Sequence, residues 1–454
     1  MQFIELLKMN IIIDQTPAKE PLRTHAVWWI LGLGTVGLIF DGYDLVVYGA
    51  VVSTFLRDAS QIGTVTPANA GALGSYALFG VAVGALIAGS VGDVIGRRKV
   101  MLTSYAWFSI GMGLTAISTD SQFFGLMRFI TGLGIGSLVV ITAALIAEYA
   151  PKDKKNLFIA ISVGGIPLGS MLSALLAMIL MERIGWRAMF WTGALPIVTL
   201  LPLAYFKMPE SINWLAARGR LEQAQLLAQR IGVGVPEPHP RSSDDVALTN
   251  NDHQIGFAGL FSSYYFLPTL ILGFMSATGL LLVYSLNTWL PELMLRAGYN
   301  TKGSLAFLAV LNGGSLLGAL VASRIADRFG PKPVVAASFA TGAVALMLLT
   351  LNLPLATLLG VVAFVGLGTS GTQTLIYGFV ANYYRTNVRA SGVAWCAGFG
   401  RLGGIGGPVL GSFLIASGLA LNSIFHVFSA IALIGVLFTL LVPLERSSFK
   451  ASKL

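Results

Sequence analysis

The sequence predicts an all-α integral membrane protein with twelve transmembrane helices arranged in two six-helix bundles. Of its 454 residues, 55% are hydrophobic and only 11% are charged, compared with about 25% charged in an ordinary soluble domain. The mean hydropathy of +0.77 is too high for a soluble chain, because a folded protein still exposes a large share of its surface to water. Twelve apolar runs of about 20 residues, the length that crosses a hydrocarbon core, divide the chain.

The N-terminal bundle is expected at residues 26–206, after a cytoplasmic tail at 1–25. Its first span is too long for a cleaved signal peptide and carries acids in its middle. The six spans are expected near 26–52, 70–92, 99–118, 122–147, 156–180 and 187–206.

A polar cytoplasmic linker is expected at 207–264, with an amphipathic helix candidate in PESINWLAARGRLEQAQLLAQRIG. The C-terminal bundle follows at 265–443, and a cytoplasmic tail at 444–454 ends the chain. Glycines interrupt the eleventh apolar run. The six spans are expected near 265–290, 304–325, 332–351, 354–381, 390–416 and 419–443.

The distribution of cations predicts the orientation. Of the 29 lysines and arginines, 22 fall in the tails, the linker and the loops on the same side, and five fall in the loops on the other side. By the positive-inside rule, both termini and the linker are cytoplasmic. The net charge of +9 therefore reflects membrane topology, and no nucleic-acid partner is needed to explain it.

Span one carries two acids in the motif FDGYDLVVYG. Asp41 and Asp44 are three residues apart and share a helical face, with Tyr48 one turn further on. An ionisable residue at bilayer depth is costly and is a functional candidate by default. Burial and like-charge repulsion disfavour ionisation of both acids together, a property that proton coupling needs. Alternatively, one acid caps a helix break at Gly42 or pairs permanently with an arginine.

Arg401 is expected about 18 Å into the eleventh span. Its guanidinium stays charged, and its planar fork fits a carboxylate. Six glycines between 398 and 407 leave room for a ligand around it. Trp395 and Phe399 flank it in the sequence and are expected to stack on a flat ligand. The alternative is a permanent ion pair between Arg401 and a span-one acid.

Four further residues belong to the candidate site. The rings of Tyr48 and Tyr284 lie in the first span of each half and are expected to contact a flat apolar ligand. Arg128 lies about six residues into span four, where it can pair with a span-one acid. Glu148 lies at the cytoplasmic end of the same span, and it can serve a cytoplasmic gate or a proton exit, or remain a solvated interfacial acid.

Two loops indicate an internal duplication. The loop after span two reads GSVGDVIGRRKV and the loop after span eight reads ASRIADRFGPKPV, so that Asp93 matches Asp327. Because the acid recurs at the same place in each half, we expect parallel halves of the kind found in secondary transporters. Alternatively, these are two ordinary basic cytoplasmic loops.

The first loop resembles the loop signature of the major facilitator superfamily, and the resemblance covers about 25–445. It implies the major facilitator fold and a gating role for this loop. Gly89 would let two helices touch, and Asp93 would pair with a cation or a helix N-terminus of the opposite half when the cytoplasmic side is closed. Arg97 and Arg98 would anchor the loop.

Three segments, DGYD, NTWLPELM and GVAWCAGFGRLGGIGGP, resemble the aromatic acid:proton symporter family of that superfamily. Within the family, the segments DGYDLVVYG and TPANAGALGSYALFG are most similar to those of benzoate carriers. The resemblance places the acidic pair of that family on Asp41 and Asp44 and its eleventh-span arginine on Arg401. Further charged positions of the family's pattern fall on Arg128, Glu148, Asp93, Asp327 and Arg389, of which Arg128 and Glu148 are expected in proton coupling and the rest in gating. Pro331 and Lys332 stand where arginines are usual, so the two loop copies are not equivalent.

These features together predict a proton-coupled symporter in a bacterial inner membrane. It would import a small aromatic carboxylate such as benzoate or a hydroxybenzoate, with Arg401, Trp395, Phe399, Tyr48, Tyr284 and Asp44 around the substrate. Its expected partners are the substrate, the proton and the lipid bilayer. We expect a monomer with no cofactor, the proton being the coupling ion. The alternatives are a carrier of another organic acid, a drug-efflux antiporter, and a membrane receptor or sensor built on a transporter scaffold.

An enzyme or an ATP-driven pump is not expected. The sequence contains no Walker-type phosphate loop, no zinc-spaced set of histidines and cysteines, and no Ser/His/Asp arrangement. Its single cysteine, Cys396, excludes an internal disulfide framework and a thiolate metal site.

Overall fold

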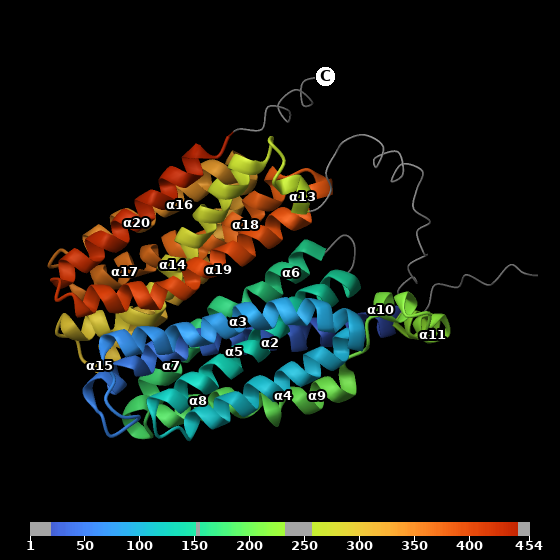
Figure 1. The fold of residues 1–454 in the computed structure, drawn as a ribbon, viewed down its shortest axis with the longest axis horizontal. Coiled ribbons are helices and arrows are strands. Elements are labelled where there is room, and N and C mark those ends of the chain that lie inside the picture. Colours follow the sequence, from blue (N-terminus) through green and yellow to red (C-terminus); the bar gives the residue numbers. More distant parts are fainter. Residues whose placement is uncertain (1–19, 151–154, 232–256, 444–454) are drawn as a thin grey trace, which may run out of the picture.

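The computed structural model describes residues 20–150, 155–231 and 257–443. Within this part of the chain all regular structure is helical, and the helices form two bundles that lie side by side (Figure 1). Among the described residues, eleven helical segments, some of them joined from two or three helices, are long and apolar enough to cross a membrane. The remaining predicted span is α4 (Arg97–Ala116), whose 20 residues begin with three consecutive cations. The predicted fold class, an all-helical membrane protein, is confirmed.

The N-terminal bundle comprises the helices up to residue 207. Polar caps fix the starts of two of its spans, because the side chains of Thr66 and Asp120 accept hydrogen bonds from backbone N–H groups three residues later. The helices are α2 (Glu20–Arg57), α3 (Pro67–Ile95), α4, α5 (Ser121–Tyr149), α6 (Lys155–Val163), α7 (Gly165–Arg183), α8 (Trp186–Ala194), the 3-10 helix η1 (Leu195–Ile197) and α9 (Leu200–Lys207).

The C-terminal bundle has one irregular span. The tenth span changes to a π-helical turn, η2, between α17 and α18. The bundle comprises α14 (Phe266–Arg296), α15 (Thr301–Phe329), α16 (Pro331–Leu348), α17 (Leu355–Gly366), η2 (Leu367–Gly371), α18 (Thr372–Tyr383), α19 (Thr386–Ala416) and α20 (Leu421–Leu441).

The expected interruption of the eleventh span by glycines is wrong, because α19 is continuous through them. The glycines instead allow close packing against α14. A Cβ on Gly403 would lie 1.9 Å from the Ala277 carbonyl oxygen, and a Cβ on Gly407 would lie 2.8 Å from the Leu281 carbonyl oxygen. Small residues let helix backbones approach in this way.

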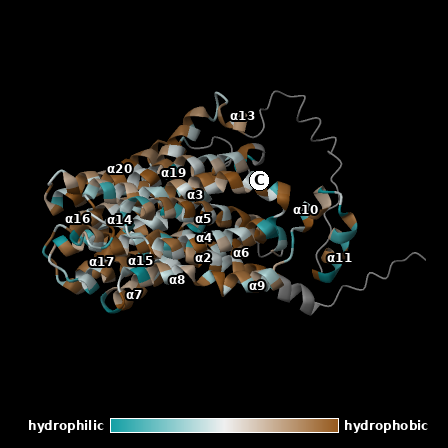
Figure 2. Ribbon diagram, turned by 60° about the horizontal axis from the view of Figure 1, so that its bottom comes forward, coloured by the Kyte–Doolittle hydropathy of each residue, from teal (hydrophilic) through white to brown (hydrophobic). Residues whose placement is uncertain are grey.

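The polar linker folds as short helices outside the bundles. The predicted amphipathic segment forms two helices, α10 (Ile212–Ala217) and α11 (Leu221–Ile231), because Gly219 adopts a positive φ of 74° between them. Figure 2 shows hydrophilic residues gathered on α11 and hydrophobic residues along both bundles. A short helix, α13 (Phe257–Leu260), precedes the second bundle. The expected tail residues 1–19 and 444–454 and the linker residues 232–256 lie outside the described part of the chain.

The two bundles meet at the end opposite to α10 and α11, which we call the far end (Figure 1). There a Cβ on Gly49 of α2 would lie 1.9 Å from the Asn287 carbonyl oxygen of α14. The hydroxyl of Ser75 on α3 donates to the Ile405 carbonyl oxygen of α19 at 2.7 Å. The halves are therefore closed against each other at the far end.

Candidate functional site

A cavity of about 310 Å³ lies between the two bundles. This volume is at the lower end of the range, roughly 300–1,000 Å³, that small-molecule sites occupy. Its walls come from both halves of the chain. The N-terminal bundle contributes Asp41, Leu45, Val46, Val81, Val139, Val163, Ile166, Pro167 and Ser170, and the C-terminal bundle contributes Leu280, Val283, Tyr284, Asn287, Asn312, Ser315, Ala319, Ser370, Gln373, Thr374, Tyr377 and Arg401.

Asp41 and Arg401 supply the two charges of this cavity, one from each bundle. Asp41 is 4% exposed. Neither side chain forms a hydrogen bond or an ion pair with any residue that the structure describes, although each lies within electrostatic range of the other. The alternative of a permanent ion pair between Arg401 and a span-one acid is wrong for this conformation. Both charged groups are available to a ligand.

Asp44 lies outside the cavity and is ion-paired with Arg128 of α5 inside the N-terminal bundle. Their side chains are 1% and 2% exposed, and Arg128 also donates to the Asp44 backbone oxygen at 3.2 Å. The Arg128 guanidinium carbon lies 6.0 Å from the centre of the Tyr48 ring. The Tyr48 hydroxyl donates to the Ala70 carbonyl oxygen at 2.6 Å. The expectation that Asp44 and Tyr48 contact substrate in this cavity is therefore wrong, because other groups of their own bundle occupy them.

Trp395 and Phe399 also lie away from the cavity. Their rings stack on each other at 5.2 Å, and the Trp395 indole N–H donates to the Thr269 carbonyl oxygen at 2.9 Å. Phe399 and Trp395 precede Arg401 by two and six residues. At about 100° per residue, these separations place both rings on the side of the helix away from Arg401. Proximity in the sequence was misleading here, and the expectation that the pair stacks on substrate is wrong.

The aromatic lining instead comes from Tyr284, as expected, and from Tyr377. Sequence reasoning missed Tyr377 together with Gln373, Asn312 and Ser315, which also line the cavity. The available signal was their spacing of three or four residues inside otherwise apolar spans, which places polar groups on one helix face.

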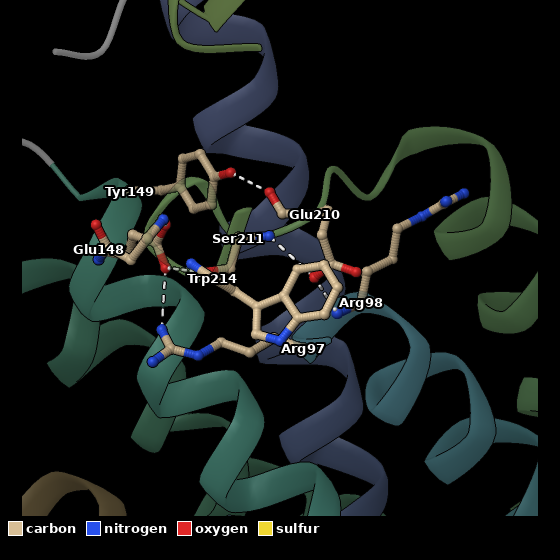
Figure 3. A network of polar contacts seen from close by, with 8 residues as sticks. Arg97, Arg98, Glu148, Tyr149, Glu210, Ser211 and Trp214 are labelled. Carbon is tan, nitrogen blue, oxygen red and sulfur yellow. Dashed lines mark hydrogen bonds and ion pairs between the residues drawn. The ribbon is translucent and has the colours of Figure 1, made fainter. Parts of the chain in front are cut away.

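A polar network anchors α10 to the N-terminal bundle, at the end that we call the linker end (Figure 3). The Glu148 carboxylate is 6% exposed and lies 2.9 Å from Arg97. It also accepts from the Ser211 hydroxyl at 2.7 Å and from the Asn213 N–H at 2.8 Å. The alternative of a solvated interfacial acid is wrong for Glu148, because this carboxylate is buried and holds the start of α10. A role in moving protons has no support from this geometry.

Residues on either side of the turn between α3 and α4 contact α10 and the residues that flank it. The Arg98 N–H donates to the Glu210 carboxylate at 2.9 Å. The Asp93 backbone oxygen accepts from Trp214 Nε1 and from Arg218, each at 3.0 Å. The expectation that Gly89 lets two helices touch is wrong in this conformation, because a Cβ there would meet no atom within 4 Å.

The other expected gating residues have exposed side chains in this conformation. The side chains of Asp93, Asp327 and Arg389 are exposed. Neither carboxylate forms an ion pair within the described residues, and Arg389 donates to the Tyr384 carbonyl oxygen at 3.3 Å. Their gating role stays a prediction for the opposite conformation, in which the linker end is closed.

An acid at the far end was missed by sequence reasoning. Glu292 of α14 is 2% exposed and lies 2.9 Å from Arg57 of α2 and 2.9 Å from Arg296. A second pair, Lys302 with Glu182, also joins the bundles at 3.0 Å. The signal in the sequence was an acid within the apolar run NTWLPELM.

Two helical bundles around a charged central cavity define a membrane transporter of the major facilitator type. The family of sugar (and other) transporters matches residues 33–448, and the chain belongs to this family. It is a multi-pass membrane transporter and not an enzyme.

Several transporters are similar along most of the chain. The benzoate transport protein of Acinetobacter baylyi is 33% identical over 96% of this chain and 92% of its own length. The gentisate transporter of Corynebacterium glutamicum is 33% identical over 89% and 85%, and the gallate transporter of Pseudomonas putida is 32% identical over 88% of both chains. The fold is similar to the inward-open xylose transporter XylE of E. coli, with a TM-score of 0.72 at 18% identity, covering 93% of this chain and 98% of that one.

Proposed function

We propose that this transporter imports a small aromatic carboxylate together with a proton across a bacterial inner membrane. The observation that carries the proposal is Arg401, which lines the cavity between the bundles and forms no ion pair or hydrogen bond with any described residue. A cation at bilayer depth is costly unless a partner neutralises it. A substrate carboxylate is a suitable partner, because the guanidinium fork binds it with two hydrogen bonds.

The rest of the cavity suits an aromatic ring. Tyr284 and Tyr377 offer ring faces and edges, and Val46, Val81 and Ile166 offer apolar surface. Aromatic contacts favour a flat ligand beyond simple burial. The names of the similar transporters, for benzoate, gentisate and gallate, support the same substrate class.

Asp41 is the proposed proton carrier. Its carboxylate lies in the cavity without a hydrogen-bond partner among the described residues, so its charged form is poorly solvated there. Arg401 can neutralise it when the substrate is absent, and a proton can do so when the substrate carboxylate occupies Arg401. Asp44 is ion-paired with Arg128 inside the N-terminal bundle and is assigned a structural role in this scheme.

The closed far end and the charge distribution suggest the direction of access. The linker end carries most of the cations and is proposed to be cytoplasmic, as are both termini. The cavity then faces the cytoplasm in this conformation. The alternate conformation would open the far end and close the linker end. Asp93 would then pair with a cation or a helix N-terminus of the opposite half, and Asp327 would serve the same gate.

Uptake into proteoliposomes tests the proposal. Labelled benzoate and hydroxybenzoates are offered with and without an inward proton gradient. We expect uphill accumulation only with the gradient, and exchange of substrate without it. Accumulation that does not depend on the proton gradient would contradict proton coupling. Transport of organic cations and not of aromatic acids would favour the drug-efflux alternative, in which Asp41 binds the substrate.

A further inference from the structure

The two walls of the cavity differ in chemistry. Apart from Asp41, the N-terminal wall is apolar except for Ser170, whose hydroxyl donates to the Gly42 carbonyl oxygen at 3.0 Å. The C-terminal wall carries polar side chains from α15, η2 and α18. A ligand with a polar and an apolar edge would therefore turn its polar edge toward the C-terminal bundle.

Helix α15 places two unsatisfied polar groups on this wall. Asn312 and Ser315 are three residues apart, and each is 2% exposed. The Asn312 amide nitrogen donates to Asn287 Oδ1 at 2.9 Å and to the Leu308 carbonyl oxygen at 3.0 Å. This leaves Asn312 Oδ1 as an acceptor. The Ser315 hydroxyl makes no hydrogen bond to any residue in the described part of the chain.

The π-helical turn and α18 place a second such pair on the wall. Gln373 is 6% exposed, and its amide nitrogen donates to the Ser276 hydroxyl at 3.1 Å. Its Oε1 and the Ser370 hydroxyl are buried without a hydrogen-bond partner. By contrast, the neighbouring Thr369 hydroxyl donates to its own helix, to the Val365 carbonyl oxygen at 2.7 Å. Buried polar atoms without partners are rare and point to a ligand or an ordered water.

The two pairs lie on helices that touch through glycines. A Cβ on Gly371 would lie 3.3 Å from the Ser315 carbonyl oxygen, and one on Gly366 would lie 2.9 Å from the Ser315 nitrogen. The π-helical turn includes Gly371 and directly follows Gly366. Irregular turns of this kind occur frequently at functional sites. The four polar side chains therefore line the same cavity from two helical segments that are in contact.

We propose that Asn312, Ser315, Ser370 and Gln373 form a subsite for a phenolic hydroxyl on the substrate ring. This inference rests on the proposed transport of aromatic carboxylates. None of the four side chains is charged, so the subsite takes a neutral group, while Arg401 takes the carboxylate. The two free amide oxygens only accept hydrogen bonds, so the ligand group must donate one.

A comparison of substrates tests the subsite in the wild-type protein. Affinities for benzoate, the three monohydroxybenzoates, the three methoxybenzoates and phthalate are measured by calorimetry. We expect at least one hydroxybenzoate to bind about tenfold more tightly than benzoate, because it satisfies acceptors that benzoate leaves unpaired. The matching methoxybenzoate has no proton to donate and should lose this gain. Phthalate should bind no better than benzoate.

Substitutions test whether these side chains cause the preference for a hydroxybenzoate over benzoate. Gln373→Leu removes an acceptor, and Ser370→Ala removes a hydroxyl with little change in volume. Each should reduce the preference for the hydroxybenzoate over benzoate by about threefold to tenfold. Thr369→Val is the matched control, because its hydroxyl is already bonded to Val365. It should leave the preference unchanged.

The outcomes separate this inference from the proposed function. Equal binding of benzoate and all hydroxybenzoates would overturn the subsite and leave aromatic acid transport in place. A preference that survives both Gln373→Leu and Ser370→Ala would also overturn it. Failure of every aromatic acid to bind would overturn the proposed function itself.

Discussion

Arg57 at the end of α2 and Glu292 on α14 form an ion pair that joins the two bundles, with 2.9 Å between Arg57 Nη1 and the Glu292 carboxylate. The Glu292 side chain is 3% exposed, while that of Arg57 is 49% exposed. Glu292 also accepts from Arg296, one turn later on the same helix, at 2.9 Å. A single buried acid thus holds two arginines and closes the far end.

The first prediction concerns this closure. Glu292→Gln keeps the size of the side chain but removes its charge, so that Arg57 and Arg296 lose their partner. We expect the equilibrium to shift toward an open far end. A change of about 1 kcal/mol in the free-energy difference between the two conformations changes the ratio of their populations roughly fivefold. A cysteine at Ser53, which lines a small hollow beside Arg57, reports the shift through its rate of reaction with an impermeant maleimide in a Cys396→Ala background.

The second ion pair between the bundles supplies the control. Lys302 and Glu182 are 56% and 45% exposed, and exposed pairs contribute little. Lys302→Ala should therefore leave the labelling rate near that of the parent. Equal rates in Glu292→Gln and its parent would contradict the role of Glu292 in closing the far end.

The second prediction separates Asp44 from Asp41. Asp44→Asn leaves Arg128 as a buried, uncompensated charge, which typically costs about 3–5 kcal/mol. We expect a clear loss of thermal stability in purified protein. Replacing both partners, as in Asp44→Asn with Arg128→Met, should recover much of that loss, because no unpaired charge remains. Unfolding of Asp44→Asn at the wild-type temperature would argue against a structural role for the pair.

The fold class could be predicted from the sequence because it depends on the length and hydrophobicity of each segment. Apolar runs of sufficient length specify membrane helices regardless of their partners. Local irregularities were less visible. Gly403 and Gly407 suggested a break in the eleventh span, whereas they permit contact with α14. A glycine-rich run alone does not tell a bend from close packing.

Three residues of the cavity were predicted from the sequence, namely Asp41, Arg401 and Tyr284. Arg401 and Asp41 were found because a charge at bilayer depth is rare. Trp395 was misplaced because closeness in the sequence was taken for a shared helix face. The pairing of Arg57 with Glu292 depends on how two distant helices are aligned along their axes, and the pattern of one sequence does not specify that alignment.

The third prediction tests proton coupling. Asp41→Asn preserves size and hydrogen bonding but cannot exchange a proton. We expect it to abolish uphill uptake driven by a proton gradient while substrate counterflow, which needs no net proton movement, continues. Because Asp41 has no partner among the described residues, the variant should remain folded. Wild-type accumulation by Asp41→Asn would exclude this residue as the proton carrier.

The fourth prediction concerns the linker. Glu148→Gln weakens the ion pair with Arg97 and the contacts to Ser211 and Asn213. We expect the backbone amides of α10 to exchange with deuterium several times faster, as measured by mass spectrometry on peptides covering 211–217. Glu222→Gln on α11, where the side chain is exposed, is the control and should not change this exchange. Unchanged exchange in Glu148→Gln would show that α10 is held by other contacts.

The fifth prediction is that Arg401 binds the substrate carboxylate. Benzamide has the shape of benzoate but no charge, and we expect it to bind wild-type protein at least about tenfold more weakly, because charge-assisted hydrogen bonds are roughly twice as strong as neutral ones. Arg401→Lys keeps the charge but loses the planar fork, so that binding of benzoate weakens without being lost. Arg401→Ala should erase most of the preference for benzoate over benzamide. It also removes the cation that interacts electrostatically with Asp41. The double variant Arg401→Ala with Asp41→Asn therefore separates loss of the ligand contact from a change in the charge of the cavity. Calorimetry on purified protein measures the affinities for benzoate and for benzamide.

If the Arg401→Ala variant keeps a strong preference for the carboxylate, the anion site lies elsewhere. Arg128 would then be the next residue to test, because it is 2% exposed and lies within a membrane span of the N-terminal bundle.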